Sequence, residues 1–168
     1  MNTVQNAKGK PPAALSKFMR TQSAIFIVAL GPTVPELDID SLGPLYLGTI
    51  DKTLFSMLTP EVRTILAGRN SKSVVLFGIE VRSLNMCRYS ESNSLQSHVC
   101  VLQSTLDLLS EGYDVHVLAD GVSSCNKEEV PIALDRMRQA GAQITTSESA
   151  AFQLQRTPTV SVEIAIRC

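Results

Sequence analysis

Short apolar runs separated by longer amphipathic stretches extend through most of this sequence. Residues 24–29 and 73–78 are apolar, rich in β-branched side chains and free of charge, which predicts strands covered on both faces of a sheet. Residues 113–119 and 142–146 predict further strands. Residues 30–45 hold three prolines and two glycines, which predicts an ordered loop rather than a helix.

Helical spacing marks the segments between these strands. Thr59 offers an N-cap, Pro60 follows at the first helical position, and that helix should stop at Gly68. A second helix is predicted because apolar residues recur at helical spacing before Gly112, which should end it. These apolar residues are Val99, Leu102, Leu106 and Leu109.

The last part of the chain alternates in the same way. Residues 127–140 predict a helix whose first turn Pro131 should delay or kink. Ser147 caps a final predicted helix that fades near Leu154. The remaining residues, 155–168, give one possible edge strand and are interpreted as a variant C-terminal tail.

Strands that alternate with helices imply a parallel sheet between two layers of helices. The predicted fold class is therefore α/β, a doubly wound three-layer α/β/α sandwich with a mostly parallel sheet. Functional groups in such sheets lie at the carboxyl ends of the strands. Chemistry is thus expected in the residues that follow Ala29, Phe77 and Ala119.

Composition narrows the class of protein. A chain of 168 residues with 44% hydrophobic residues and a net charge of −1 suits one soluble globular domain. This charge provides no basic field for nucleic acid or acidic lipid. No apolar run approaches the ~20 residues that a membrane-spanning helix needs. We therefore predict neither a nucleic-acid partner nor a membrane partner.

Cysteine usage and the first residues bear on the compartment. The cysteines form no CxxC pair, so a zinc site or a disulfide framework is not expected and a reducing compartment, the cytoplasm, is favoured. They are Cys87, Cys100, Cys125 and Cys168. Residues 1–35 carry basic but no acidic side chains, as a mitochondrial presequence would, so mitochondrial import is the alternative. Without import, residues 1–23 are interpreted as a disordered or variant segment.

Cys100 is the first candidate for chemistry. It lies at the predicted start of the second helix, where unpaired backbone N–H groups and the positive end of the helix dipole favour a thiolate. It is out of phase with the apolar stripe and shares a face with Ser104 and Asp107. Both interpretations stay open at this point, a nucleophile and an inert buried thiol.

Other polar residues near the predicted strand ends also allow two interpretations. Lys52 is either one half of a solvated surface pair with Asp51 or a catalytic lysine. Asp120 is either a turn and helix-capping acid or, with Ser123, part of a pocket border.

The two histidines give little support to metal chemistry. His116 alternates with valines on a predicted strand, which favours a hydrogen-bonded core or edge histidine, and His98 precedes the candidate cysteine. No carboxylate stands at ligand spacing from either, so we expect no metal. Phosphate-binding GxGxxG and GxxxxGK[ST] loops and a GxSxG elbow are absent from the sequence, so we expect no cofactor.

Six motifs, each weak alone, occur in an order that is specific. They are LGPTVPEL (30–37), DKTLFSM (51–57), SVVLFGIE (73–80), HVCVLQSTLDLL (98–109), VHVLADGVSS (115–124) and RMRQAGAQITTSE (136–148). Together they resemble the isochorismatase-like cysteine hydrolases, most closely the animal isochorismatase domain-containing proteins. The resemblance implies a doubly wound parallel sheet and a family domain over residues 24–154.

In hydrolytic members the resemblance implies an Asp–Lys–Cys triad acting on a small amide or related substrate, in a homo-oligomer. Cys100 matches the nucleophile, which attacks a carbonyl to give a thioester. Lys52 matches the lysine that helps to lower the thiol pKa. The backbone N–H groups of Val99 and Cys100 would hold the oxyanion. The pocket candidates are His98, Asp120 and Ser123.

The sequence departs from the family pattern at three places. The family's catalytic aspartate ends an earlier strand, whereas residues 1–35 contain no acid, so the general base is missing. Residues 81–97 stand where relatives have a single residue, and 155–168 do not continue the last family helix. We therefore expect a fold that lacks part of the first strand unit. We also expect a looser cysteine turn, and a misplacement of about 1 Å can cost ~100-fold in rate.

These departures predict an isochorismatase-like chain with little or no turnover. The alternative is a non-catalytic interaction or scaffold module that retains the fold, and a third possibility is that the chain does not fold stably. Residues 81–97 are interpreted as an inserted loop that arose from incomplete or alternative splicing. Sequencing transcripts across the codons for Glu80 and His98 tests that hypothesis, which fails if every transcript encodes the insert.

Overall fold

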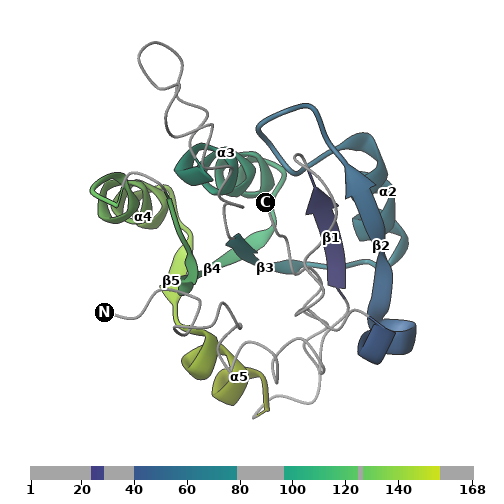
Figure 1. The fold of residues 1–168 in the computed structure, drawn as a ribbon. Helices are drawn as coiled ribbons and strands as arrows, with labels where there is room; N and C mark the ends of the chain where they lie inside the picture. The colour runs from purple at the N-terminus through teal and green to yellow at the C-terminus, as the bar shows by residue number, and fades with distance from the viewer. Residues whose placement is uncertain (1–23, 29–39, 79–96, 125–126, 156–168) are drawn as a thin grey trace.

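The computed structural model describes residues 24–28, 40–78, 97–124 and 127–155, which Figure 1 shows as coloured ribbon. The elements in these ranges are β1 (Ala24–Val28), η1 (Asp40–Leu45), β2 (Tyr46–Asp51), α2 (Pro60–Gly68), β3 (Ser73–Gly78), α3 (Ser97–Ser110), β4 (Asp114–Val122), α4 (Glu129–Gln139), β5 (Gln143–Thr145) and α5 (Ser147–Gln155). The predictions for the terminal segments 1–23 and 156–168 lie outside these ranges. So do the predictions for residues 81–96, and the cysteines Cys87, Cys125 and Cys168.

Parallel pairing organises the strands into two groups. β3, β4 and β5 form one sheet in that order, with Ser73 opposite Asp114 and His116 opposite Gln143. β1 and β2 form a separate parallel pair. Helices α3 and α4 cover one face of the three-stranded sheet and α5 lies on its other face (Figure 1). The predicted α/β class, with a mostly parallel sheet and helices on both faces, is therefore confirmed.

The predicted strands correspond to β1, β3, β4 and β5, but the sequence patterns missed two elements. β2 was not predicted, because Gly48 interrupts its apolar residues and pairing with β1 supplies what the local sequence lacks. The 3₁₀ helix η1 lies inside the predicted loop, and it is broken at Gly43, whose φ of 50° is non-helical. β4 continues to Val122 rather than ending at Ala119.

The helix boundaries follow their capping residues. Thr59 caps α2 as predicted, since its Oγ1 accepts the N–H of Val62 at 3.4 Å. Gly112 ends α3 with a φ of 84°, and the N–H of Tyr113 returns to the Leu108 carbonyl at 3.1 Å. This turn sends the chain directly into β4, so α3 and β4 are joined at a fixed angle.

The hydrophobic core lies between β3–β4 and the helices α2, α3 and α4. Its largest fully buried side chains include Leu66, Leu76, Phe77, Leu108, Leu118 and Met137. Burying a side chain of this size stabilises the fold by roughly 1.5–3 kcal/mol relative to leaving it exposed. Val101 and Leu108 anchor α3 in this core, so the first turn of α3 is held against the sheet.

Candidate functional site

Lys52 and Cys100 meet although they stand far apart in the sequence. Lys52 directly follows β2, and Cys100 lies in the first turn of α3. The Lys52 Nζ donates a hydrogen bond to the Cys100 Sγ at 3.4 Å. The carboxyl end of a strand and the start of a helix therefore bring an amine and a thiol into direct contact.

The Lys52 ammonium is held in a fixed direction. Its side chain is only 6% exposed, and its Nζ also donates to the carbonyl oxygens of Leu54 at 3.0 Å and Phe55 at 2.8 Å. An ammonium has three N–H donors, so these two carbonyls and the sulfur use all of them. Lys52 is therefore not one half of a solvated surface pair with Asp51, which was the alternative interpretation of the sequence.

The groups that accept hydrogen bonds from the Lys52 ammonium carry no full negative charge while Cys100 is a thiol. Among the described residues, they are two carbonyls and one sulfur, and no carboxylate lies within ion-pair distance of the ammonium. Burying an ammonium without an anion is costly, and carbonyl dipoles offset only part of that cost. A thiolate at Cys100 would add a negative charge to the described partners of Lys52.

Cys100 is a half-buried, reduced cysteine. α3 begins at Ser97, so Cys100 is within the first turn, where the helix dipole favours an anion. Val99 precedes it and is also half-buried. His98 lies in the same turn by its backbone, while its side chain is outside the described part of the structure.

Ser104 connects the two segments that carry the lysine and the thiol, a role that the sequence did not predict. It is completely buried, at 0% exposure. Its Oγ accepts the N–H of Met57 at 2.8 Å and donates to the carbonyl of Cys100 at 2.6 Å. The one signal in the sequence is its place four residues after Cys100, on the same helix face.

Asp120 lies at the end of β4 and bonds to the start of α5. Its Oδ1 accepts the N–H of Ser147 at 2.8 Å, and its Oδ2 accepts the Ser147 hydroxyl at 2.5 Å. Both carboxylate oxygens thus cap a helix N-terminus, which is the helix-capping interpretation of this residue. The structure does not bring Asp120 into contact with Lys52.

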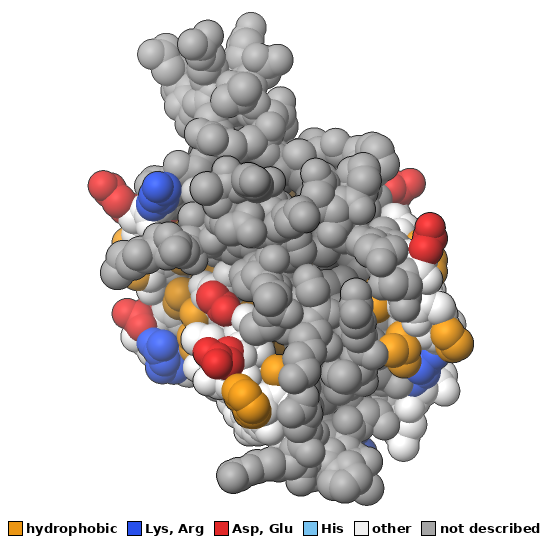
Figure 2. Space-filling model, turned by 60° about the horizontal axis from the view of Figure 1, so that its bottom comes forward, with side chains coloured by type: hydrophobic (Ala, Val, Ile, Leu, Met, Phe, Trp, Pro, Cys, Tyr) orange, Lys and Arg blue, Asp and Glu red, His pale blue; other side chains and the backbone are white. Residues whose placement is uncertain are grey.

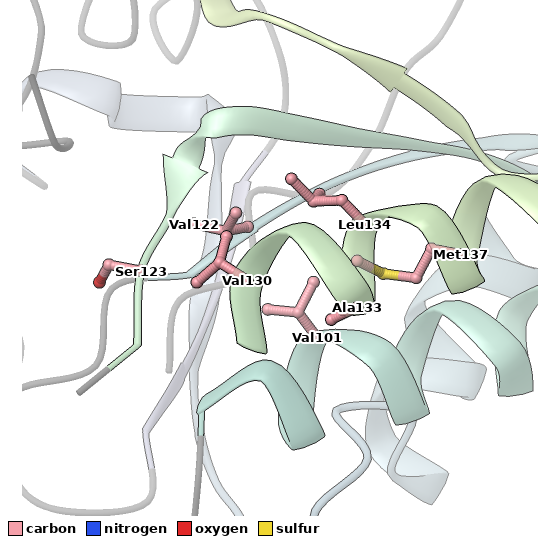
Figure 3. Close-up of a pocket in the computed structure, with 7 residues that line it drawn as sticks. All are labelled: Val101, Val122, Ser123, Val130, Ala133, Leu134 and Met137. Atoms are coloured by element: carbon pink, nitrogen blue, oxygen red, sulfur yellow. The ribbon is translucent and has the colours of Figure 1, made fainter. Parts of the chain in front are cut away.

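Ser123 lines a small apolar cavity rather than the contact between Lys52 and Cys100. The cavity lies between α3, α4 and the end of β4 (Figure 3), and its other lining residues are Val101, Val122, Val130, Ala133, Leu134 and Met137. Its volume of about 10 Å³ is at the lower limit for one water molecule. This cavity is therefore a gap in packing and not room for a substrate.

His116 lies half-buried in β4, in the middle of the sheet. Burial lowers the pKa of its imidazole below the ordinary value of 6.5, and the neighbouring Asp114 carboxylate opposes part of this effect. This position agrees with a structural role, while the hydrogen bond expected for this histidine stays a prediction. Within the described ranges, no group of three His, Cys, Asp or Glu side chains is placed to hold a metal ion.

The described surface carries charges of both signs. Figure 2 shows Lys and Arg side chains interspersed with Asp and Glu on one face. Of the helices in the described part of the chain, none has both the length and the apolar character needed to cross a membrane.

Comparison with known proteins identifies similar chains. A family model described as the Isochorismatase domain matches residues 95–149. Isochorismatase family protein 1B of Dictyostelium discoideum is 50% identical over 111 residues, which are 65% of this chain and 46% of that protein. Isochorismatase domain-containing protein 2 of Xenopus laevis is 44% identical over 126 residues, 74% of this chain and 51% of that protein. This chain thus spans about half the length of the curated relatives it matches.

A solved structure extends the similarity to the fold. The MAR1 ribonuclease of Caenorhabditis elegans is 33% identical to this chain, and the match covers 88% of this chain and 73% of that one with a TM-score of 0.64. The similarity in fold therefore extends beyond residues 95–149, the segment that the family model matches.

Proposed function

Since this chain belongs to the isochorismatase family of hydrolases, we propose that Lys52 and Cys100 form the nucleophilic half of a cysteine hydrolase site. The observation that carries this proposal is the 3.4 Å contact between a buried ammonium and a thiol in the first turn of a helix. A cation at that distance and the helix dipole both favour the thiolate, which is the nucleophilic form.

The proposed reaction is cleavage of a small amide or a related carbonyl compound. The Cys100 thiolate forms a bond to the carbonyl carbon, and the C–N bond breaks as the amine leaves with its electron pair and takes a proton from solvent water. The resulting thioester is then hydrolysed by water. The N–H of Val99, in the third position of α3, is among the first N–H groups of a helix, which have no acceptor within the helix. Together with the N–H of Cys100, it is proposed to hold the oxyanion.

Turnover by this chain is proposed to be slow. In the family pattern an aspartate takes the thiol proton and returns it to the leaving group, but residues 1–35 contain no acid. Among the described residues, no carboxylate contacts Lys52 to act as that proton donor, and general acid–base catalysis usually contributes ~10²–10⁴-fold in rate. We therefore propose a chain with a reactive thiol and little or no catalytic turnover.

The experiment that tests this proposal compares reactivity with turnover. The purified chain and a Cys100→Ala variant are incubated with a panel of small amides, and iodoacetamide alkylation of Cys100 is followed by peptide mass spectrometry. We expect fast alkylation of Cys100 and no turnover above the Cys100→Ala control. Cys100-dependent turnover at ordinary enzyme rates would contradict the inactive part of the proposal, and slow alkylation would contradict the reactive part.

A non-catalytic interaction module that assembles as a homo-oligomer is the second candidate. Leu54 and Phe55 favour it, because these large apolar side chains are 64% and 49% exposed beside Lys52. Light scattering after size exclusion tests this candidate. An oligomer that dissociates in a Leu54→Ser/Phe55→Ser variant supports it, and a monomeric wild-type chain contradicts it.

We propose a reducing compartment for this chain, because a thiol nucleophile must stay reduced to react. The cytoplasm is the first choice. The mitochondrial matrix is the alternative, supported by the basic, acid-poor residues 1–35. Fractionation of cells that express the whole chain with a C-terminal epitope distinguishes the two compartments.

A further inference from the structure

Ser104 has no part in the proposed chemistry, yet it touches both segments of the thiol site. Its hydroxyl accepts the N–H of Met57 and donates to the carbonyl of Cys100, at 2.8 and 2.6 Å. Met57 lies in the lysine segment, residues 52–59, which connects β2 to α2, and Cys100 lies one helical turn before Ser104. One buried hydroxyl therefore ties the lysine segment to the turn that carries the thiol.

We infer that Ser104 is a positioning residue that sets the distance between the Lys52 ammonium and the Cys100 sulfur, an inference that rests on the proposed function. The ammonium is oriented by the carbonyls of Leu54 and Phe55, which belong to the segment that Ser104 fixes at Met57. A shift of this segment moves those carbonyls and, with them, the Nζ relative to the sulfur.

Because Ser104 is buried, water cannot easily replace its two hydrogen bonds. Ser104 and Met57 are both 0% exposed, so water has no ready access to the Met57 N–H if the hydroxyl is removed. A buried N–H that loses its acceptor must find another one, and it can do so only if the backbone moves. Loss of the hydroxyl should therefore displace the segment after Lys52 rather than leave it in place.

Thr105 offers a matched control on the same helix. It is also 0% exposed, and its Oγ1 also donates to the carbonyl four residues earlier, that of Val101, at 2.7 Å. Its other contact is with the Met137 Sδ at 3.1 Å, so it links α3 to α4 and not to the lysine segment. The two residues share their burial and their helix bond and differ in the segment that they reach.

The test measures the rate of Cys100 alkylation by iodoacetamide against pH in the whole chain, with peptide mass spectrometry to follow Cys100 and the other cysteines separately. The variants are Ser104→Ala, Thr105→Val and Lys52→Met. We expect Lys52→Met to slow alkylation at neutral pH by about tenfold or more, because each unit by which a thiol pKa rises lowers the thiolate population about tenfold. Ser104→Ala should slow it by about three- to tenfold and raise the midpoint of the pH profile, while Thr105→Val stays within about twofold of wild type.

Three further readouts separate positioning from loss of stability. Ser104→Thr keeps the hydroxyl and should restore the wild-type pH profile. The double variant Ser104→Ala/Lys52→Met should react no more slowly than Lys52→Met alone, because the Ser104 hydroxyl affects the thiol only through Lys52. A general loosening of the fold would instead lower the free energy of unfolding of Ser104→Ala well below that of Thr105→Val, which urea denaturation measures.

The outcomes for this inference and for the proposed function are distinguishable. If Lys52→Met slows alkylation but Ser104→Ala matches Thr105→Val, the positioning role of Ser104 is overturned and the proposed function stands. If Lys52→Met leaves the pH profile of Cys100 alkylation unchanged, the proposal that Lys52 activates the thiol is wrong. The inference about Ser104 is then wrong as well.

Discussion

Two polar junctions in this protein join a strand end to the start of a helix, and they differ in how their charges are satisfied. At one junction the Lys52 ammonium, after β2, reaches Cys100 in α3. At the other the Asp120 carboxylate, in β4, reaches Ser147 at the start of α5. Both are linked through side chains that lie far apart in the sequence.

The difference lies in the groups that each charge meets. The Asp120 carboxylate accepts an N–H and an O–H from Ser147, so each of its oxygens has a hydrogen-bond donor. The Lys52 ammonium meets two carbonyls and a sulfur that becomes its counterion only by losing a proton. The Asp120 junction stabilises the fold, whereas the Lys52 junction is proposed to favour ionisation of the thiol and so to prepare a nucleophile.

Substitution of Gly121, which follows Asp120 in β4, is expected to change stability more than any other substitution proposed below. A Cβ at this position would lie 2.8 Å from the Cβ of Phe77 and 3.0 Å from that of Leu118. We expect Gly121→Ala to lower the free energy of unfolding by about 1–3 kcal/mol, as overpacking does in other cores. Urea denaturation followed by circular dichroism measures this change.

Gly68→Ala is the control for that substitution. No atom lies within 4 Å of a Cβ built on Gly68, at the end of α2. Alanine should therefore be neutral there, or stabilising by up to ~1 kcal/mol. Equal destabilisation by the two variants would show that the close approach of Phe77 is not the cause.

Asp120→Ala should have a smaller effect on stability and none on the thiol. Removal of a helix cap of this kind costs about 0.5–2 kcal/mol, and Ser147 would lose the acceptors of its N–H and its hydroxyl. We expect Cys100 alkylation to stay within about twofold of wild type, since each tenfold change in rate would need ~1.4 kcal/mol of coupling between the junctions. A melt and an alkylation rate measured on one sample test both statements. If Asp120→Ala slowed alkylation as much as Lys52→Met does, the Asp120 junction would also affect the thiol, and the prediction would be wrong.

The fold was largely predictable, because its signals are local. β-branched runs marked β1 and β3, and Thr59, Pro60 and Gly112 marked helix boundaries that the structure confirms. β2 was not predictable from its own residues, because its strand conformation depends on pairing with β1.

The candidate site was predictable only in part. The helix-start position of Cys100 follows from helical periodicity, but no local pattern marks Lys52 as buried or shows that it reaches the thiol. Ser104 was still harder to predict. A serine inside a helix has no special meaning in the sequence, and only the structure shows that it accepts the Met57 N–H. Such contacts are set by tertiary packing, which sequence spacing does not encode.

Substitution of His116 is expected to have the smallest effect, a change in how stability depends on pH that leaves both junctions unaltered. Burial lowers its pKa below 6.5 in the folded chain, so the unfolded chain binds more protons as the pH falls through 6.5. Stability should therefore be lost progressively below about pH 6.5, and His116→Gln should flatten that slope without changing Cys100 alkylation. Urea denaturation of wild type and variant between about pH 5 and 8 measures both slopes. Parallel slopes would mean that other groups cause the pH dependence. A change in alkylation would mean instead that the middle of β4 is coupled to the thiol.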